Sequence, residues 1–341
     1  IGFPLSGYLL SFLTQDANVL IPATQYLQIS FIAIIAMFIY NIFQSALRGV
    51  GEVKLPMFII LVAVVLNFFL DPLFMFGYGF IPAMGVPGVA LATLITEYLC
   101  AVIGIVVMLK GYGSLKVSFA HMVPRMEWLK KLLRLGLPSS AEFSFRSFGF
   151  VLMVFVVSFF GTMATAAYGI GTRIFSFVII PAIGFALATS SLIGNNLGSK
   201  QHDRAEKIAK TGMTVAFMSL TAVGILLTIF APQISAFFVP GEPELISTSA
   251  SFIRMMAWSF GLVGAQIVIV GTIRASGKTK TVMLLVISNT IIQFVLSYVI
   301  SMTLGYKEIG VWISYPISTV ISTTAAYYFY ARKDWLRKRI V

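Results

Sequence analysis

Apolar residues run in long stretches along the whole chain, and short polar connections separate them. Each stretch holds roughly 20 residues, the length that an α-helix needs to cross a hydrocarbon core about 30 Å thick. The short alternating strands of a membrane β-barrel are not seen. The pattern predicts an all-α integral membrane protein. About nine transmembrane helices are expected, near residues 22–46, 56–78, 87–109, 137–160, 165–193, 208–231, 247–271, 281–304 and 309–331.

Composition supports lipid as the solvent of this chain. Hydrophobic residues make up 58% of the sequence and charged residues only 11%, with a mean hydropathy of +0.94. A soluble domain of this length could not bury so much apolar surface. The single cysteine, Cys100, lies in an apolar run and excludes a disulfide framework or a cysteine metal site. The two histidines, His121 and His202, fall in polar connections, where solvated surface positions are expected.

The net charge of +12 reflects membrane topology. Lys and Arg gather in alternate connections, near residues 48–54, 110–134, 200–210, 274–280 and 332–339. By the positive-inside rule these connections and the C-terminus face the cytoplasm, so a multi-pass protein of the plasma membrane is expected. This placement argues against nucleic acid as a partner.

An internal repeat appears when the sequence is shifted on itself. Residues 46–54 lie over 272–280, an offset of 226, and Asn67 then falls on Gln293. Both loops are basic, so the two copies are expected to have the same orientation in the membrane. The second copy runs from about Glu127 and holds six of the predicted helices, whereas the first shows three. The repeat therefore predicts two pseudo-symmetric six-helix bundles, with nearly three helices upstream of Ile1.

The expected organisation has three parts. Residues 1–115 would form the remainder of the N-terminal bundle, 116–135 a cytoplasmic linker and 136–341 the C-terminal bundle. Within the linker, residues 126–134 are amphipathic. They either lie in the cytoplasmic interface or run straight into the next helix.

Three carboxylates fall well inside predicted helices: Asp71, Glu97 and Glu142. Each costs at least about 3 kcal/mol near the bilayer centre, so each suggests a function. Asn67 and Asp71 are four residues apart and share one helical face. Pro72 removes a backbone hydrogen bond and frees a carbonyl beside the carboxylate. Together they suggest a proton or cation site, although an Asp that extends to the outer interface beside a proline kink remains the structural alternative.

The other intramembrane charges suggest pairing. Glu142 precedes Arg146 by one helical turn, a spacing suited to an ion pair. The pair is either structural or has a role in ion coupling or cation binding. Glu97 has no basic partner in sequence and is expected to contact Thr hydroxyls or a hydrated cavity. Arg173 is expected to pair structurally with a carboxylate. Small residues at near-helical spacing, in 184–194 and at Gly88 and Ala92, predict close helix approaches.

No catalytic motif is found. The sequence contains no Gly-rich phosphate loop with Lys-Ser/Thr, no metal-ligand cluster and no nucleophile elbow, so an enzyme is not expected. Transport without a nucleotide-binding module requires an ion gradient or a partner protein, and no bound cofactor is predicted beyond H+ or Na+.

Several segments together resemble the multidrug and toxic compound extrusion (MATE) family. The resemblance covers nearly the whole chain in order, and its motifs are weak singly and specific as a set. They are the segments 47–56, 67–72, 85–93, 136–138, 161–173, 181–184, 194–198 and 310–312. Members of that family have twelve helices in two lobes and exchange cationic, lipophilic compounds for protons or sodium.

The resemblance also implies site residues. Asn41, Asn67, Asp71 and Thr93 match the N-lobe polar cluster of the DNA-damage-inducible branch, whose further aspartate on the first helix would lie upstream of Ile1. Glu142 matches a seventh-helix glutamate used by other branches. No acid lies in 247–271, where the sodium-coupled branch carries an aspartate, which favours protons, with Na+ at Asp71 as the alternative.

The function expected from these residues is secondary active multidrug efflux by cation antiport and alternating access. The expected partners are lipophilic or cationic small molecules and membrane lipid, and a monomer is expected. Two alternatives stay open: a flippase of the same superfamily for a lipid-linked saccharide, for which only Arg146 and Arg173 supply cationic groups, and a channel or receptor.

Overall fold

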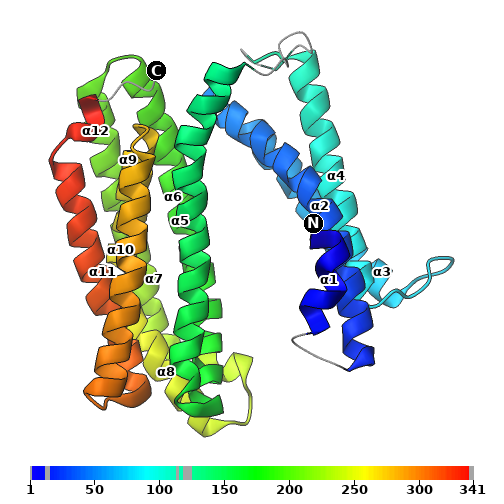
Figure 1. Cartoon of the computed structure of the whole chain (residues 1–341), viewed down its shortest axis with the longest axis vertical. Coiled ribbons are helices and arrows are strands. Elements are labelled where there is room, and N and C mark those ends of the chain that lie inside the picture. Colours follow the sequence, from blue (N-terminus) through cyan, green and yellow to red (C-terminus); the bar gives the residue numbers. More distant parts are fainter. Residues whose placement is uncertain (1, 12–15, 113–114, 118–124, 338–341) are drawn as a thin grey trace. The chain divides into compact units, whose positions relative to one another are not determined.

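The computed structural model describes residues 2–11, 16–112, 115–117 and 125–337; His121 lies outside this set. The chain forms two compact units, residues 1–123 and 124–341. Helices make up nearly all of both units (Figure 1). The first unit holds α1 (Gly2–Ser11), α2 (Ala17–Gly49), α3 (Lys54–Phe76) and α4 (Val86–Lys110). The second holds α5 (Met126–Ser158), α6 (Gly161–Gly198), α7 (His202–Phe238), α8 (Pro243–Ala257), α9 (Phe260–Ala275), α10 (Thr279–Tyr298), the π-helical turn η2 (Val299–Thr303), α11 (Lys307–Ala331) and α12 (Asp334–Arg337).

Helices occupy all nine predicted spans. Within the described residues, seven are long and apolar enough to cross a membrane, or eight if a bent pair counts as one span. The ninth predicted span is α11, which has 25 residues but is rich in Ser and Thr. Several of these hydroxyl residues are buried, among them Ser314 and Ser318, so packing inside the unit compensates for the lower apolarity. The all-α membrane fold is confirmed.

The span predicted at 247–271 is broken. Helices α8 and α9 meet at an angle of 50° around Trp258 and Ser259. The Ser259 hydroxyl donates to the carbonyl of Met256 at 2.7 Å, and the Ser259 amide donates to the same carbonyl at 2.9 Å. Such local bonds compete with regular i to i+4 pairing, and here they lie at the point where the two helices bend.

The amphipathic segment 126–134 forms the first turns of α5, which continues without a break to Ser158. The helix therefore begins inside the segment predicted as a linker. Trp128 is exposed, and the ammonium of Lys131 lies 4.8 Å from the centre of its ring.

The two copies of the sequence repeat share backbone geometry. Gly51 and Gly277, which are 226 residues apart, both have positive φ, at 85° and 78°. Gly51 N–H donates to the carbonyl of Arg48 at 3.1 Å, and Gly277 N–H donates to that of Arg274 at 2.9 Å. Each loop thus ends its preceding helix in the same way, with glycine where a left-handed conformation is required. The two loops that the sequence repeat aligns therefore have the same backbone conformation.

In the first unit, α4 packs against both α2 and α3. The core between them is apolar and includes Tyr40, Phe43, Leu47 and Cys100. The Tyr40 hydroxyl donates to the carbonyl of Pro56 at 2.7 Å, which satisfies the one polar atom of this ring. Much of α3 remains exposed, as expected for a helix whose other neighbours are lipid or further helices.

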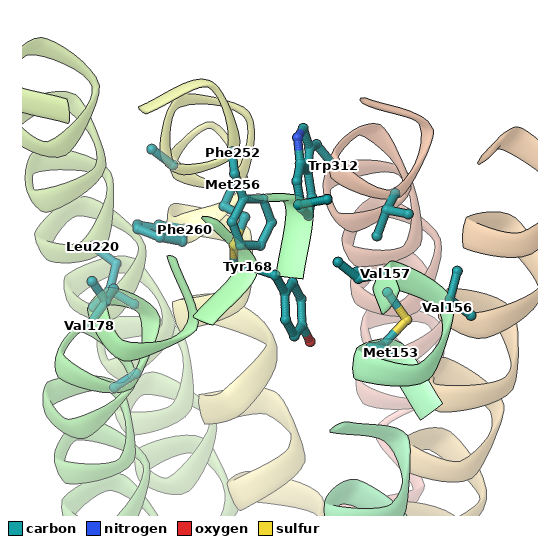
Figure 2. Packing of buried hydrophobic residues seen from close by; sticks show 14 residues of the cluster. Met153, Val156, Val157, Tyr168, Val178, Leu220, Phe252, Met256, Phe260 and Trp312 are labelled. Carbon is teal, nitrogen blue, oxygen red and sulfur yellow. The ribbon is translucent and has the colours of Figure 1, made fainter. Parts of the chain in front are cut away.

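The second unit has an aromatic centre. Figure 2 shows Phe252 of α8 and Trp312 of α11 close to Tyr168 of α6. The rings of Phe252 and Trp312 lie 4.2 Å apart, and those of Tyr168 and Phe252 are stacked at 5.5 Å. The hydroxyls of Tyr168 and Tyr315 bond to each other at 2.8 Å. Such pairs add about 0.5–1.5 kcal/mol each beyond burial, so this cluster ties three helices together.

Glycines allow close helix contacts in both units. A Cβ at Gly264 of α9 would lie 2.7 Å from the carbonyl oxygen of Ala216 on α7. A Cβ at Gly88 of α4 would lie 2.4 Å from that of Phe74 in the first unit, as the small-residue pattern predicts. By contrast, no atom of the described residues lies within 4 Å of a Cβ built at Gly184 or Gly194, so the predicted close approach is not found at these two positions.

These contacts make a prediction about stability. Gly264→Ala is expected to lower the free energy of unfolding by about 2 kcal/mol, because the new methyl meets backbone atoms that cannot rotate away. Gly194→Ala, also inside a helix but in open space, should be neutral or slightly stabilising. Thermal melting of the purified protein in detergent compares the two variants, and equal melting temperatures would contradict the packing of α9 on α7.

Candidate functional site

The strongest candidate in the first unit is the Asn67–Asp71 pair on α3. The Asn67 Nδ2 donates to Asp71 Oδ1 at 3.2 Å, and both side chains are half-buried. The predicted shared helical face is confirmed. Pro72 lies inside α3 and cannot donate to the carbonyl of Phe68, so an acceptor is freed one turn before the carboxylate. The pair thus offers a carboxylate, an amide and a carbonyl within one turn of helix.

The other two residues of the predicted N-lobe cluster are not joined to this pair. Asn41 on α2 donates to the carbonyl of Met37 at 2.9 Å, and Thr93 on α4 donates to that of Val89 at 3.1 Å. Both side chains are exposed. Among the described residues, no hydrogen bond links either of them to Asp71. Asn41 and Thr93 each bond the backbone of their own helix, so only the local pair on α3 is assembled.

Glu97 on α4 is half-buried, and within the described part of the chain no ion pair reaches it. The expected support from Thr hydroxyls is not observed, because Thr96 donates to the carbonyls of Ala92 and Thr93. Glu97 is therefore a second carboxylate of the first unit without a basic partner in the described residues.

Glu142 lies in a three-residue charge cluster of the second unit, which we call the α5–α9 charge cluster: Glu142, Arg146 and Arg274. The Nη2 of Arg274 donates to both carboxylate oxygens, at 2.6 and 2.8 Å. The predicted pair with Arg146 is present but long, at 3.5 Å. The Glu142 side chain is 1% exposed, against 36% for Arg274 and 47% for Arg146. Glu142 is thus neutralised mainly by a residue from the end of another helix.

Sequence reasoning missed Arg274 as a partner, because it assigned this residue to a basic loop. The sequence repeat gave one signal, since Arg274 aligns with Arg48 at the offset of 226 and both lie in the last turn of a helix. Arg48 donates to Ser45 Oγ at 3.0 Å and also bonds the side-chain oxygen of Gln44. An arginine in the last turn of a helix is also favoured by the helix dipole.

Arg173 on α6 is exposed, and no ion pair reaches it among the residues that the structure describes. The structural pairing expected for it is not observed there.

A buried hydroxyl–amide cluster occupies the position in the second unit that corresponds to the Asn67–Asp71 pair. Gln293 and Ser297 are the repeat equivalents, and Gln293 Nε2 lies 3.4 Å from Ser297 Oγ. Gln293 also donates to Ser314 at 2.8 Å, Ser297 and Ser314 bond at 2.6 Å, and Ser318 bonds Gln293 Oε1. This cluster is neutral, so the acid lies at only one of the two equivalent positions.

The described residues contain no group of three or more His, Cys, Asp or Glu that could hold a metal ion. The Asn67–Asp71 pair supplies one carboxylate, which suits a proton or, with the amide and the free carbonyl, a monovalent cation. Ionisable residues inside membrane-spanning helices are typical of proteins that move ions or solutes across the membrane.

Comparison with known proteins identifies the family of this chain. The MatE family model matches residues 1–73 and 138–299, and the two matched segments end 226 residues apart, the offset of the repeat. The chain is 28% identical over 327 residues to the probable multidrug resistance protein YoeA of Bacillus subtilis, covering 95% of this chain and 70% of that protein. It is 25% identical to the probable multidrug resistance protein NorM of Thermotoga maritima, covering 99% of this chain and 73% of that protein.

The fold agrees with these relatives. A solved outward-facing multidrug resistance MATE transporter superposes with a TM-score of 0.90 at 24% identity, covering 99% of this chain and 75% of that one. The chain belongs to the MatE family of membrane transporters, whose fold it has.

Proposed function

We propose that this protein is a secondary active exporter that exchanges small lipophilic, often cationic compounds for protons. Its family membership supports a transporter, and two relatives carry the name multidrug resistance protein. The observation that carries the proton part is the Asn67–Asp71 pair: a half-buried carboxylate in an apolar helix, bonded to a neutral amide and reached by no ion pair among the described residues.

Asp71 is the proposed proton carrier. A carboxyl group can hold a proton, and when it is ionised it attracts a cation. A proton and a cationic substrate therefore compete for the same negative charge, which is the minimal requirement for antiport by alternating access. Asn67 would orient the ionised carboxylate through its Nδ2. Na+ is the alternative ion, held by the carboxylate, the Asn67 amide oxygen and the free carbonyl of Phe68.

We place the basic connections and the C-terminus on the cytoplasmic side of the plasma membrane. Counted from Lys54, Asp71 then lies about 25 Å along α3, toward the outer face, at 1.5 Å per residue. A monomer without nucleic-acid partners is proposed.

Transport assays in proteoliposomes test this function. Uptake of a fluorescent lipophilic cation by the full-length protein is expected when an outward-directed proton gradient is imposed, and a sodium gradient of the same size should drive little. Uptake driven only by a sodium gradient would identify Na+ as the coupling ion instead. Uptake that needs no countertransport would indicate a channel, and transbilayer movement of a lipid-linked saccharide without cation uptake would indicate a flippase.

A further inference from the structure

The membrane-embedded part of the second unit has an excess of positive charge. Glu142 is the one acid of its described residues that lies away from a helix end. Arg146 and Arg173 lie well inside helices, and Arg274 reaches the same depth as Glu142 through its ion pair. In the first unit the balance is reversed, since Asp71 and Glu97 lie inside helices there. The charged residues that lie inside helices are therefore mainly basic in the second unit and acidic in the first.

The α5–α9 charge cluster has a net charge of +1, from two guanidinium groups and one carboxylate. Arg274 already gives Glu142 two short contacts, and the carboxylate is buried. Arg146 keeps a single contact at 3.5 Å, the outer limit of a hydrogen bond, while nearly half of its side chain is exposed. Within the part of the chain that the structure describes, the buried Nε of Arg274 has no hydrogen-bond partner. Arg146 is the group of this cluster whose charge is least neutralised.

Two phenylalanines flank Arg146 on its own helix, and the guanidinium of Arg274 lies 6.0 Å from the ring centre of one of them, Phe143. Phe143 and Phe150 lie one turn before and one turn after it on the same face of α5, and both are more than half exposed, at 60% and 52%. A surplus cation on such a surface is costly in a membrane unless an anion accompanies it. Guanidinium presents a planar fork of N–H groups that matches the oxygens of a carboxylate or phosphate.

We propose that the strip Phe143–Arg146–Phe150 binds an amphiphilic anion. Arg146 takes the carboxylate or phosphate group, and the two phenylalanines take the apolar body. The site goes beyond the cation exchange assigned to Asp71 and lies on a different unit, so either one can fail without the other. The same oxyanion chemistry occurs in anionic solutes and in phospholipid headgroups.

Binding of matched probes tests the site without any transport step. The full-length protein in phosphatidylcholine nanodiscs is titrated with pyrenebutyrate and with the neutral pyrenebutanol, which has the same apolar body. Arg146→Gln is expected to weaken pyrenebutyrate binding at least tenfold, about 1.4 kcal/mol, and to change pyrenebutanol binding less than twofold. Arg146→Lys should keep part of the affinity, because it keeps the charge but loses the fork. Arg173→Gln is the matched control, an exposed arginine inside a neighbouring helix, and should bind like the wild type.

A second arm separates the two sources of the anion. In nanodiscs that contain phosphatidylglycerol, a lipid occupant would weaken pyrenebutyrate binding to the wild type and leave Arg146→Gln unchanged. An unchanged wild-type affinity would assign the site to a soluble anion. Wild-type affinity of Arg146→Gln for pyrenebutyrate, or an equal loss for both probes, would overturn the proposal.

Discussion

Asp71→Asn is expected to abolish gradient-driven efflux in the full-length protein. Asparagine keeps the size of the side chain and its bond with Asn67, but it cannot exchange a proton or carry a negative charge. If Asp71 is the coupling group, the loss is complete, so transport by the variant should fall to that of protein-free liposomes. The measurement is uptake of a fluorescent cation into proteoliposomes under an imposed proton gradient.

Two further variants define the result. Asn67→Ala removes the orienting amide but leaves the carboxylate, so partial activity is expected. Glu242→Gln, at an exposed helix start, removes a carboxylate that has no role in the proposal and should transport like the wild type. Full transport by Asp71→Asn would refute the assignment.

Glu142→Gln is expected to cause the largest loss of stability, about 3 kcal/mol. Removing the carboxylate leaves two guanidinium groups close together, with Arg274 unpaired beside a buried amide. The double variant Glu142→Gln/Arg274→Gln should recover much of the loss, because it removes the unpaired charge along with its partner. Unfolding of the purified protein in mixed micelles, followed by tryptophan fluorescence, measures both.

The exposed Glu242→Gln again serves as the control and should change the free energy of unfolding by less than about 0.5 kcal/mol. A single variant as stable as the wild type, or a double variant less stable than the single one, would contradict the pairing.

The helices of this chain follow from local sequence, whereas their breaks do not. Apolar length alone placed all nine predicted helical segments, because a membrane leaves few other ways to satisfy the backbone. The bend lies at Ser259, whose hydroxyl and amide both bond the carbonyl of Met256, and hydropathy does not encode such local bonds. Glycine contacts show the same limit: Gly88 and Gly194 look alike in sequence, but only Gly88 meets another helix closely.

The contacts of the candidate sites also differ in how far the sequence predicts them. The Asn67–Asp71 bond joins residues four apart on one helix, so spacing predicts it. Arg274 reaches Glu142 across 132 positions of the chain, and helix packing alone determines that contact. The residues implied by family resemblance, Asn41 and Thr93, bond to their own helices instead. Within these sites, the bond between residues of one helix was predictable, and the ion pair between two helices was not.

The most direct test of the account is whether substrate binding releases a proton from Asp71. The full-length protein in weakly buffered detergent solution receives a lipophilic cationic substrate, and a pH indicator records the change. The account predicts release of about one proton for each substrate bound by the wild type, since the two compete for one carboxylate, and none for Asp71→Asn. Equal release by both proteins, or none by either while substrate still binds, would contradict proton coupling at this residue.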